Sequence, residues 1–133
     1  KKNNYMDLSK KDKRLCRELI YTSLEKECAK FANDLHQAAE KPIPLAELNA
    51  PYREVNGQKV DGPWHQRYIY LYRMMHRFDR YIARTYDGIT GGHYFDTVLM
   101  LYCDNLLTDE DIARFDEETR DSLIRLKKFR EEF

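Results

Sequence analysis

Four arginines in one predicted helix, over residues 63–87, are spaced so that their side chains share one side. At about 100° per residue they fall within a sector of roughly 60°. Guanidinium forks bind phosphate oxygens and flat aromatic rings stack on bases, so such a surface could bind nucleic acid. The residues of this predicted interaction or nucleic-acid face are Arg73, Arg77, Arg80 and Arg84, with Tyr70 and Tyr81 beside them.

The alternative is that these arginines form ion pairs with acidic residues elsewhere in the protein or in a second subunit. The segment from Asp104 to Asp121 contains eight acidic residues, and its basic residues are Arg114 and Arg120. The whole chain carries 23 basic and 23 acidic side chains. Because nucleic-acid surfaces normally show a clear basic excess, we favour pairing within the protein or between subunits over nucleic-acid binding.

Asp79 is the second candidate for chemistry, because it falls on the apolar side of the same predicted helix. A buried carboxylate needs hydrogen-bond partners or retains its proton. Together with His76 and His93, Asp79 could line a buried polar pocket and act as a general base or metal ligand. The alternative is that tyrosine hydroxyls or an arginine of a neighbouring helix donate to it, which we favour because the chain has 10 tyrosines.

Motifs for catalysis and metal binding are missing from the sequence. The chain has no Glu-x-x-His or His-Glu-x-x-His pattern, no cysteine–histidine zinc spacing and no Gly-x-Ser-x-Gly turn. We therefore assign no catalytic residue, no metal and no cofactor. A small enzyme with a pocket around Asp79 is the most distant of the functional alternatives.

The elements that would position these residues follow from the placement of proline and glycine. All four prolines lie within residues 42–63, and no glycine or proline interrupts the stretches 1–41, 64–87 and 93–133. Steps of three and four between apolar residues predict helices in all three stretches. The 133 residues fit one all-α domain, a bundle of four to five helices. The predicted helices cover 8–40, 63–87, 92–107, 109–115 and 117–131, with a long loop over 41–63.

Two local patterns refine this organisation. Asn56-Gly57 between two short runs of strand-compatible residues predicts a small hairpin with a type I′ turn inside the long loop. The apolar side of the helix over 63–87 predicts a buried stripe. Its residues are Trp64, Tyr68, Leu71, Tyr72, Met75, Phe78, Ile82 and Tyr86.

Cysteine usage indicates the compartment. Cys16 and Cys28 lie on one predicted helix, roughly 18 Å apart, which is too far for a disulfide. With Cys103 they are expected to be buried free thiols in a reducing, cytoplasmic setting. No uncharged apolar run approaches the ~18 residues of a membrane helix, so we expect no membrane partner.

These features favour a non-catalytic module that binds itself or another protein. Tyrosine and arginine are enriched at interface hot spots. Basic residues on the helix over 63–87 and acidic residues after Asp104 would suit a symmetric dimer that high salt weakens. Nucleic-acid binding through the arginine and tyrosine face is the alternative.

Overall fold

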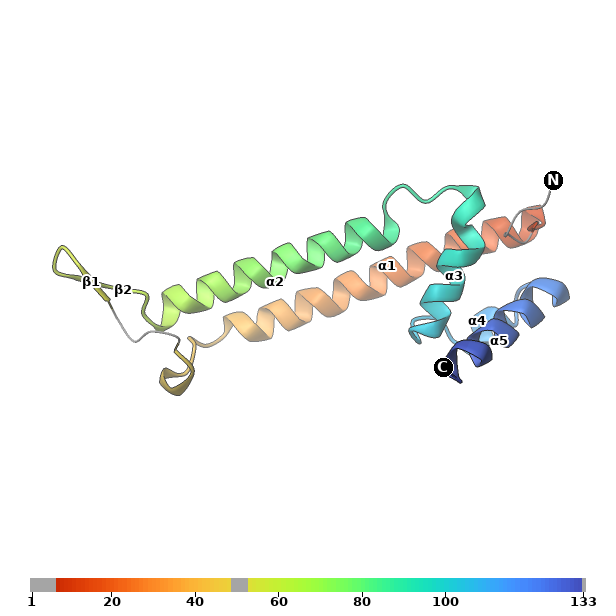
Figure 1. The fold of residues 1–133 in the computed structure, drawn as a ribbon. Coiled ribbons are helices and arrows are strands. Elements are labelled where there is room, and N and C mark those ends of the chain that lie inside the picture. The colour runs from red at the N-terminus through yellow and green to blue at the C-terminus, as the bar shows by residue number, and fades with distance from the viewer. Residues whose placement is uncertain (1–6, 49–52, 133) are drawn as a thin grey trace. The chain divides into compact units, whose positions relative to one another are not determined.

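The computed structural model describes residues 7–48 and 53–132 and confirms the all-α class (Figure 1). A two-stranded hairpin is the one sheet within these residues. The α-helices of the described residues are α1 (Lys10–Ala39), α2 (Pro63–Tyr86), α3 (Tyr94–Cys103), α4 (Asp109–Ile112) and α5 (Glu117–Glu131). The shorter elements are the 3₁₀ turns Leu45–Glu47 and Gly91–His93 and the strands β1 (Arg53–Val55) and β2 (Gln58–Val60).

The helix over 92–107 is shorter than predicted, because α3 ends at Cys103. Asn105 has a φ of 63°, in the left-handed region. The Leu106 N–H donates to the Leu101 carbonyl at 2.9 Å, and the Asn105 N–H donates to the Tyr102 carbonyl at 3.0 Å. This pair of bonds around a left-handed residue is the Schellman motif, which satisfies the last carbonyls and stops the helix. Asparagine performs here the role that glycine usually has.

The predicted hairpin is present. β1 and β2 pair antiparallel, with Val55 opposite Gln58 and Glu54 opposite Lys59. Asn56 and Gly57 between them have φ values of 54° and 79°. Two consecutive positive φ angles define the type I′ turn, which explains why this dipeptide predicts the hairpin.

Contacts divide the chain into two compact units, and α1 contributes residues to both. The first unit comprises residues 1–27 and 85–133 and contains a packed apolar core. Val98, Leu101, Ile112 and Leu123 are fully buried in it. The strongly apolar helix α3 lies largely within this core. Its buried residues are Phe95, Thr97, Val98, Leu101 and Tyr102.

A buried carboxylate joins the first turns of α1 and α5 within this unit. Asp12 is 1% exposed, and its Oδ1 accepts a hydrogen bond from the Asp116 N–H at 3.1 Å. Ser9 caps α1, since its Oγ accepts from the Asp12 N–H at 3.1 Å. The Ser9 hydroxyl also donates to Asp116 Oδ2 at 2.9 Å. Ser9 thus caps its own helix α1, while Asp12 of α1 accepts from the backbone N–H at the start of α5, and the Ser9–Asp116 bond joins the two helix starts.

The second unit comprises Cys28–Arg84 and has a different character. The C-terminal part of α1 and most of α2 run antiparallel in it, and the rings of Phe31 and Phe78 stack with centroids 4.1 Å apart. Among residues 28–48, 54–58 and 61–84, no residue is buried. The two helices of this unit pack against each other along one line of contact, which we call the seam, and this contact encloses none of those residues.

Thiol reactivity should separate the three cysteines. Cys28 is exposed, contrary to the prediction that all three are buried, whereas Cys16 is buried. Burial, followed by the charge of Asp12, raises the pKa of Cys16 to about 12. Because the thiolate is the reactive form, a disulfide reagent should label Cys28 rapidly and leave Cys16 unlabelled until the protein unfolds. The Cys28→Ser variant should lose the fast phase, and rapid labelling of native Cys16 would contradict its placement.

Replacing Asp12 by alanine should destabilise the first unit by about 1–3 kcal/mol, because the Asp116 N–H loses its acceptor at a partly buried position. Urea denaturation followed by circular dichroism measures this as a lower midpoint with an unchanged slope. Asp7→Ala serves as the control, since Asp7 is exposed. Equal midpoints for the two variants would show that the Asp12 hydrogen bond contributes nothing measurable.

Candidate functional site

The start of α2 is fixed by local chemistry. Asp61 adopts a left-handed φ of 60°, and Pro63 occupies the first helical position, where its missing N–H costs no hydrogen bond. The Gln66 side-chain amide donates to the Asp61 carbonyl at 2.7 Å. These groups fix the residue at which α2 begins.

The predicted buried stripe of α2 is wrong over its first half. Trp64, Tyr68, Tyr72 and Met75 are 58%, 63%, 61% and 50% exposed. We call these four residues the aromatic face. The apolar side of α2 is wider than one neighbouring helix covers, so one edge of it packs on α1 and the other remains at the surface. The half-buried apolar residues of α2 include Leu71, Met74, Phe78, Tyr81 and Ile82.

Four of the five arginines of α2 are exposed, and we call these four the arginine row: Arg73, Arg77, Arg80 and Arg84. Among the described residues of the second unit, no carboxylate lies within 4.0 Å of any of these four guanidinium groups. Pairing of this row with the acidic segment 104–121, which belongs to the first unit, stays a prediction. Several acids of the segment 104–121 have other partners: Asp109 accepts from Tyr102, Asp111 caps α4, Asp116 pairs with Lys11 and Asp121 with Arg120.

The two tyrosines of the predicted face have different surroundings. Tyr70 is 45% exposed, and the Arg67 guanidinium lies 5.1 Å from the centre of its ring. Tyr81 is half-buried and its ring lies 6.3 Å from that of Phe78. Tyr70 is therefore available at the surface, while Tyr81 belongs to the seam between the two helices of the second unit.

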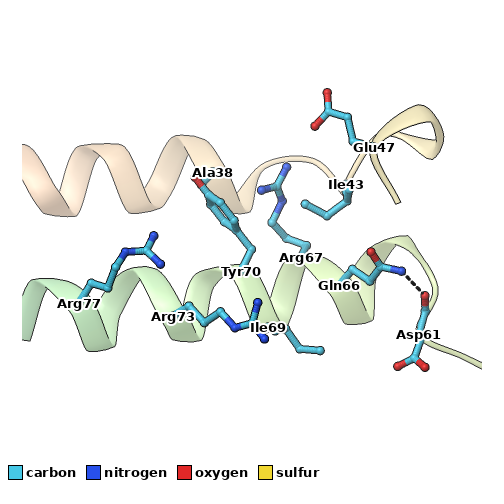
Figure 2. A pocket seen from close by; sticks show the side chains of 10 residues that line it. All are labelled: Ala38, Ile43, Glu47, Asp61, Gln66, Arg67, Ile69, Tyr70, Arg73 and Arg77. Atoms are coloured by element: carbon cyan, nitrogen blue, oxygen red, sulfur yellow. Dashed lines mark hydrogen bonds between the residues drawn. The ribbon is translucent and has the colours of Figure 1, made fainter. Parts of the chain in front are cut away.

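A cleft of about 730 Å³ opens beside α2 within the second unit (Figure 2). Arg67 anchors the adjoining loop, because its Nε donates to the Lys41 carbonyl at 2.8 Å. The Ile43 N–H donates to the Pro63 carbonyl at 3.2 Å and ties the same loop to the start of α2. The lining residues are Ala38, Ile43, Glu47, Asp61, Gln66, Arg67, Ile69, Tyr70, Arg73 and Arg77.

Sequence reasoning missed this cleft as a unit. It identified Tyr70, Arg73 and Arg77, but the apolar wall comes from Ala38, at the end of α1, and from Ile43 in the following loop. The signal available in the sequence was the pair of apolar residues among the prolines of the loop, which implied only that the loop packs on the helices. The aromatic face was also missed, because its residues were assigned to the core.

The predicted buried pocket of Asp79, His76 and His93 is contradicted by the exposure of all three residues. Asp79 lies beside the aromatic face at the surface of α2. His93 belongs to the first unit and its Nδ1 lies 3.0 Å from Thr90 Oγ1. Their exposure removes the low-dielectric surroundings that a pocket base would need.

Searches for other chemistry and for relatives find nothing. In residues 7–48 and 53–132 no group of three or more histidine, cysteine, aspartate or glutamate side chains could hold a metal ion. No helix in these ranges has both the length and the hydrophobicity that crossing a bilayer requires. Comparisons with protein-family models, curated proteins and solved structures find no match to this chain.

The free energy of unfolding of the Asp79→Asn variant should lie within about 0.5 kcal/mol of the wild-type value. Asp79 is exposed, and substitutions at exposed positions rarely change stability by more. Aspartate and asparagine also have similar helix propensities. Urea denaturation measures the difference. A loss of about 2 kcal/mol or more would instead indicate that Asp79 holds a buried network.

Proposed function

We propose that this protein is a self-associating interaction module, in which the aromatic face of α2 packs against the same face of a second copy. The observation that carries the proposal is the exposure of Trp64, Tyr68, Tyr72 and Met75 along one side of one helix. Large apolar patches at a protein surface mark binding sites, and Trp, Tyr and Met are enriched at interfaces.

The second unit supplies the physical reason for a partner. Stable domains bury the apolar side of each element against another layer, and residues 28–48, 54–58 and 61–84 of this unit contain no buried side chain. A second hairpin of two helices would provide the missing layer. Two hairpins together would have four helices, the number from which bundles are commonly built.

The size of the aromatic face is compatible with a dimer. A fully exposed aromatic side chain presents ~200 Å², so the four residues carry roughly 450 Å² of accessible surface per copy at their observed exposures. Two facing copies would thus bury roughly 900 Å² before flanking residues are included. Stable interfaces begin at ~1,200 Å² in total, which the flanking side chains can supply.

Charge placement favours a second copy as the occupant. On a helical wheel the arginine row lies on the side of α2 opposite the aromatic face, so pairing through that face keeps the two rows apart. An antiparallel pair of α2 helices with its two-fold axis at Tyr72 would bring His65 of one copy level with Asp79 of the other. This register lets the His65 ring and the Asp79 carboxylate share a hydrogen bond, and it creates no like-charge contact between the rows.

Nucleic-acid binding through the arginine row is the second candidate. It is favoured by the absence of carboxylate partners for these guanidinium groups among the described residues of their own unit. If this candidate is correct, the affinity of the protein for nucleic acid should fall steeply as the salt concentration rises, because phosphate contacts release counterions.

Light scattering coupled to size exclusion tests the self-association. The wild type should elute as a dimer at low and at high salt, because an apolar interface is not screened. The Tyr68→Glu variant should be monomeric, because dimerisation would bury an unpaired charge. Tyr21→Glu is the matched control, since Tyr21 has the same 63% exposure but lies on α1 in the first unit.

Far-UV circular dichroism should show that both glutamate variants retain the helix content of the wild type. A wild-type monomer at every concentration and salt would contradict the proposal. A dimer that Tyr21→Glu disrupts as strongly as Tyr68→Glu would place the interface elsewhere. A dimer that dissociates at high salt would favour a charged interface over the aromatic face.

A further inference from the structure

The cleft beside α2 combines uncompensated positive charge with apolar walls. Arg73 and Arg77 lie one helical turn apart and both line it. Within the described residues of the second unit neither has a carboxylate within 4.0 Å. Two neighbouring guanidinium groups can donate several hydrogen bonds to one phosphate, which makes them suited to that group.

The acids of the cleft do not cancel this charge. The Glu47 carboxylate points away from α2 in Figure 2. Asp61 lies at the far end of the cleft, and its Oδ1 is 2.9 Å from His65 Nδ1. The part of the cleft between Arg73 and Arg77 is therefore positive.

The remaining walls of the cleft suit the apolar, organic part of a phosphate-bearing ligand. Ala38, Ile43 and Ile69 provide apolar surface, and Tyr70 rises from α2 toward Ala38 (Figure 2). The hydrogen bonds of Arg67 to the Lys41 carbonyl and of Ile43 to Pro63 hold this side of the cleft in place. A volume of about 730 Å³ lies within the ~300–1,000 Å³ range of small-molecule sites and far exceeds the space a phosphate ion occupies.

We propose that this cleft binds a small organic phosphate that carries a flat ring, as a nucleoside monophosphate does. Arg73 and Arg77 hold the phosphate, while Ile43, Ile69 and Tyr70 contact the ring. The site is on the side of α2 opposite the aromatic face, so it is independent of self-association. A phosphate could also come from a nucleic-acid backbone, and the two sources differ in which arginines they use.

Calorimetric titration of the full chain with adenosine monophosphate, adenosine and inorganic phosphate tests the site. Adenosine monophosphate should bind more tightly than either of its parts. The variant Arg73→Gln/Arg77→Gln should weaken this binding roughly tenfold or more, because both charged donors are lost. The matched control is Arg80→Gln/Arg84→Gln, which removes the same charge from the same helix outside the cleft and should stay within about twofold of the wild type.

Amide shift mapping adds a readout of position, because binding should move the resonances of Gln66, Ile69 and Tyr70. Light scattering on both double variants should give the wild-type mass, which separates this test from that of self-association.

Three results would overturn the proposal. One is that none of the three compounds binds. Another is that inorganic phosphate binds as tightly as the nucleotide, since the apolar walls would then contribute nothing. The third is an equal loss of binding in both double variants with tighter binding of a single-stranded oligonucleotide, which would make the whole arginine row a nucleic-acid surface.

Discussion

The width of the apolar side of α2 is the constraint on which the second unit depends. One neighbouring helix covers only part of that side, and α1 is the long helix that α2 contacts in this unit. Leu71, Met74 and Phe78 are half-buried at this contact, while Trp64, Tyr68 and Tyr72 stay more than half exposed. Because exposed apolar surface is unfavourable in water, this uncovered edge is the strongest physical reason for an additional partner.

The first unit, by contrast, has an enclosed core. Its core includes Leu101, Ile112 and Leu123, all fully buried, and the hydrogen bonds of Asp12 and Ser9 cap two helices at once. A well-packed unit and an incompletely covered one thus occur in the same chain. Binding surfaces are expected on the second unit, where both the aromatic face and the arginine-lined cleft lie.

Helix positions could be predicted from the sequence because their signals are local. Proline at 63, asparagine–glycine at 56–57 and the acidic first turn of α5 each act within a few residues, and these elements lie where the sequence indicates. The exposure of Asp79 and Trp64 could not be predicted, since periodicity gives the apolar side of a helix but not the width that a neighbour covers. The cleft was equally hidden, because it needs the fold of the loop after α1 to bring Ile43 beside Tyr70.

The most direct test of the central claim is the fluorescence of Trp64, the single tryptophan of the chain and a member of the aromatic face. Self-association through this face predicts that its emission shifts to shorter wavelength and resists acrylamide quenching as protein concentration rises. The Tyr68→Glu variant should show neither change. Emission and quenching typical of a water-exposed tryptophan at every concentration would contradict the claim.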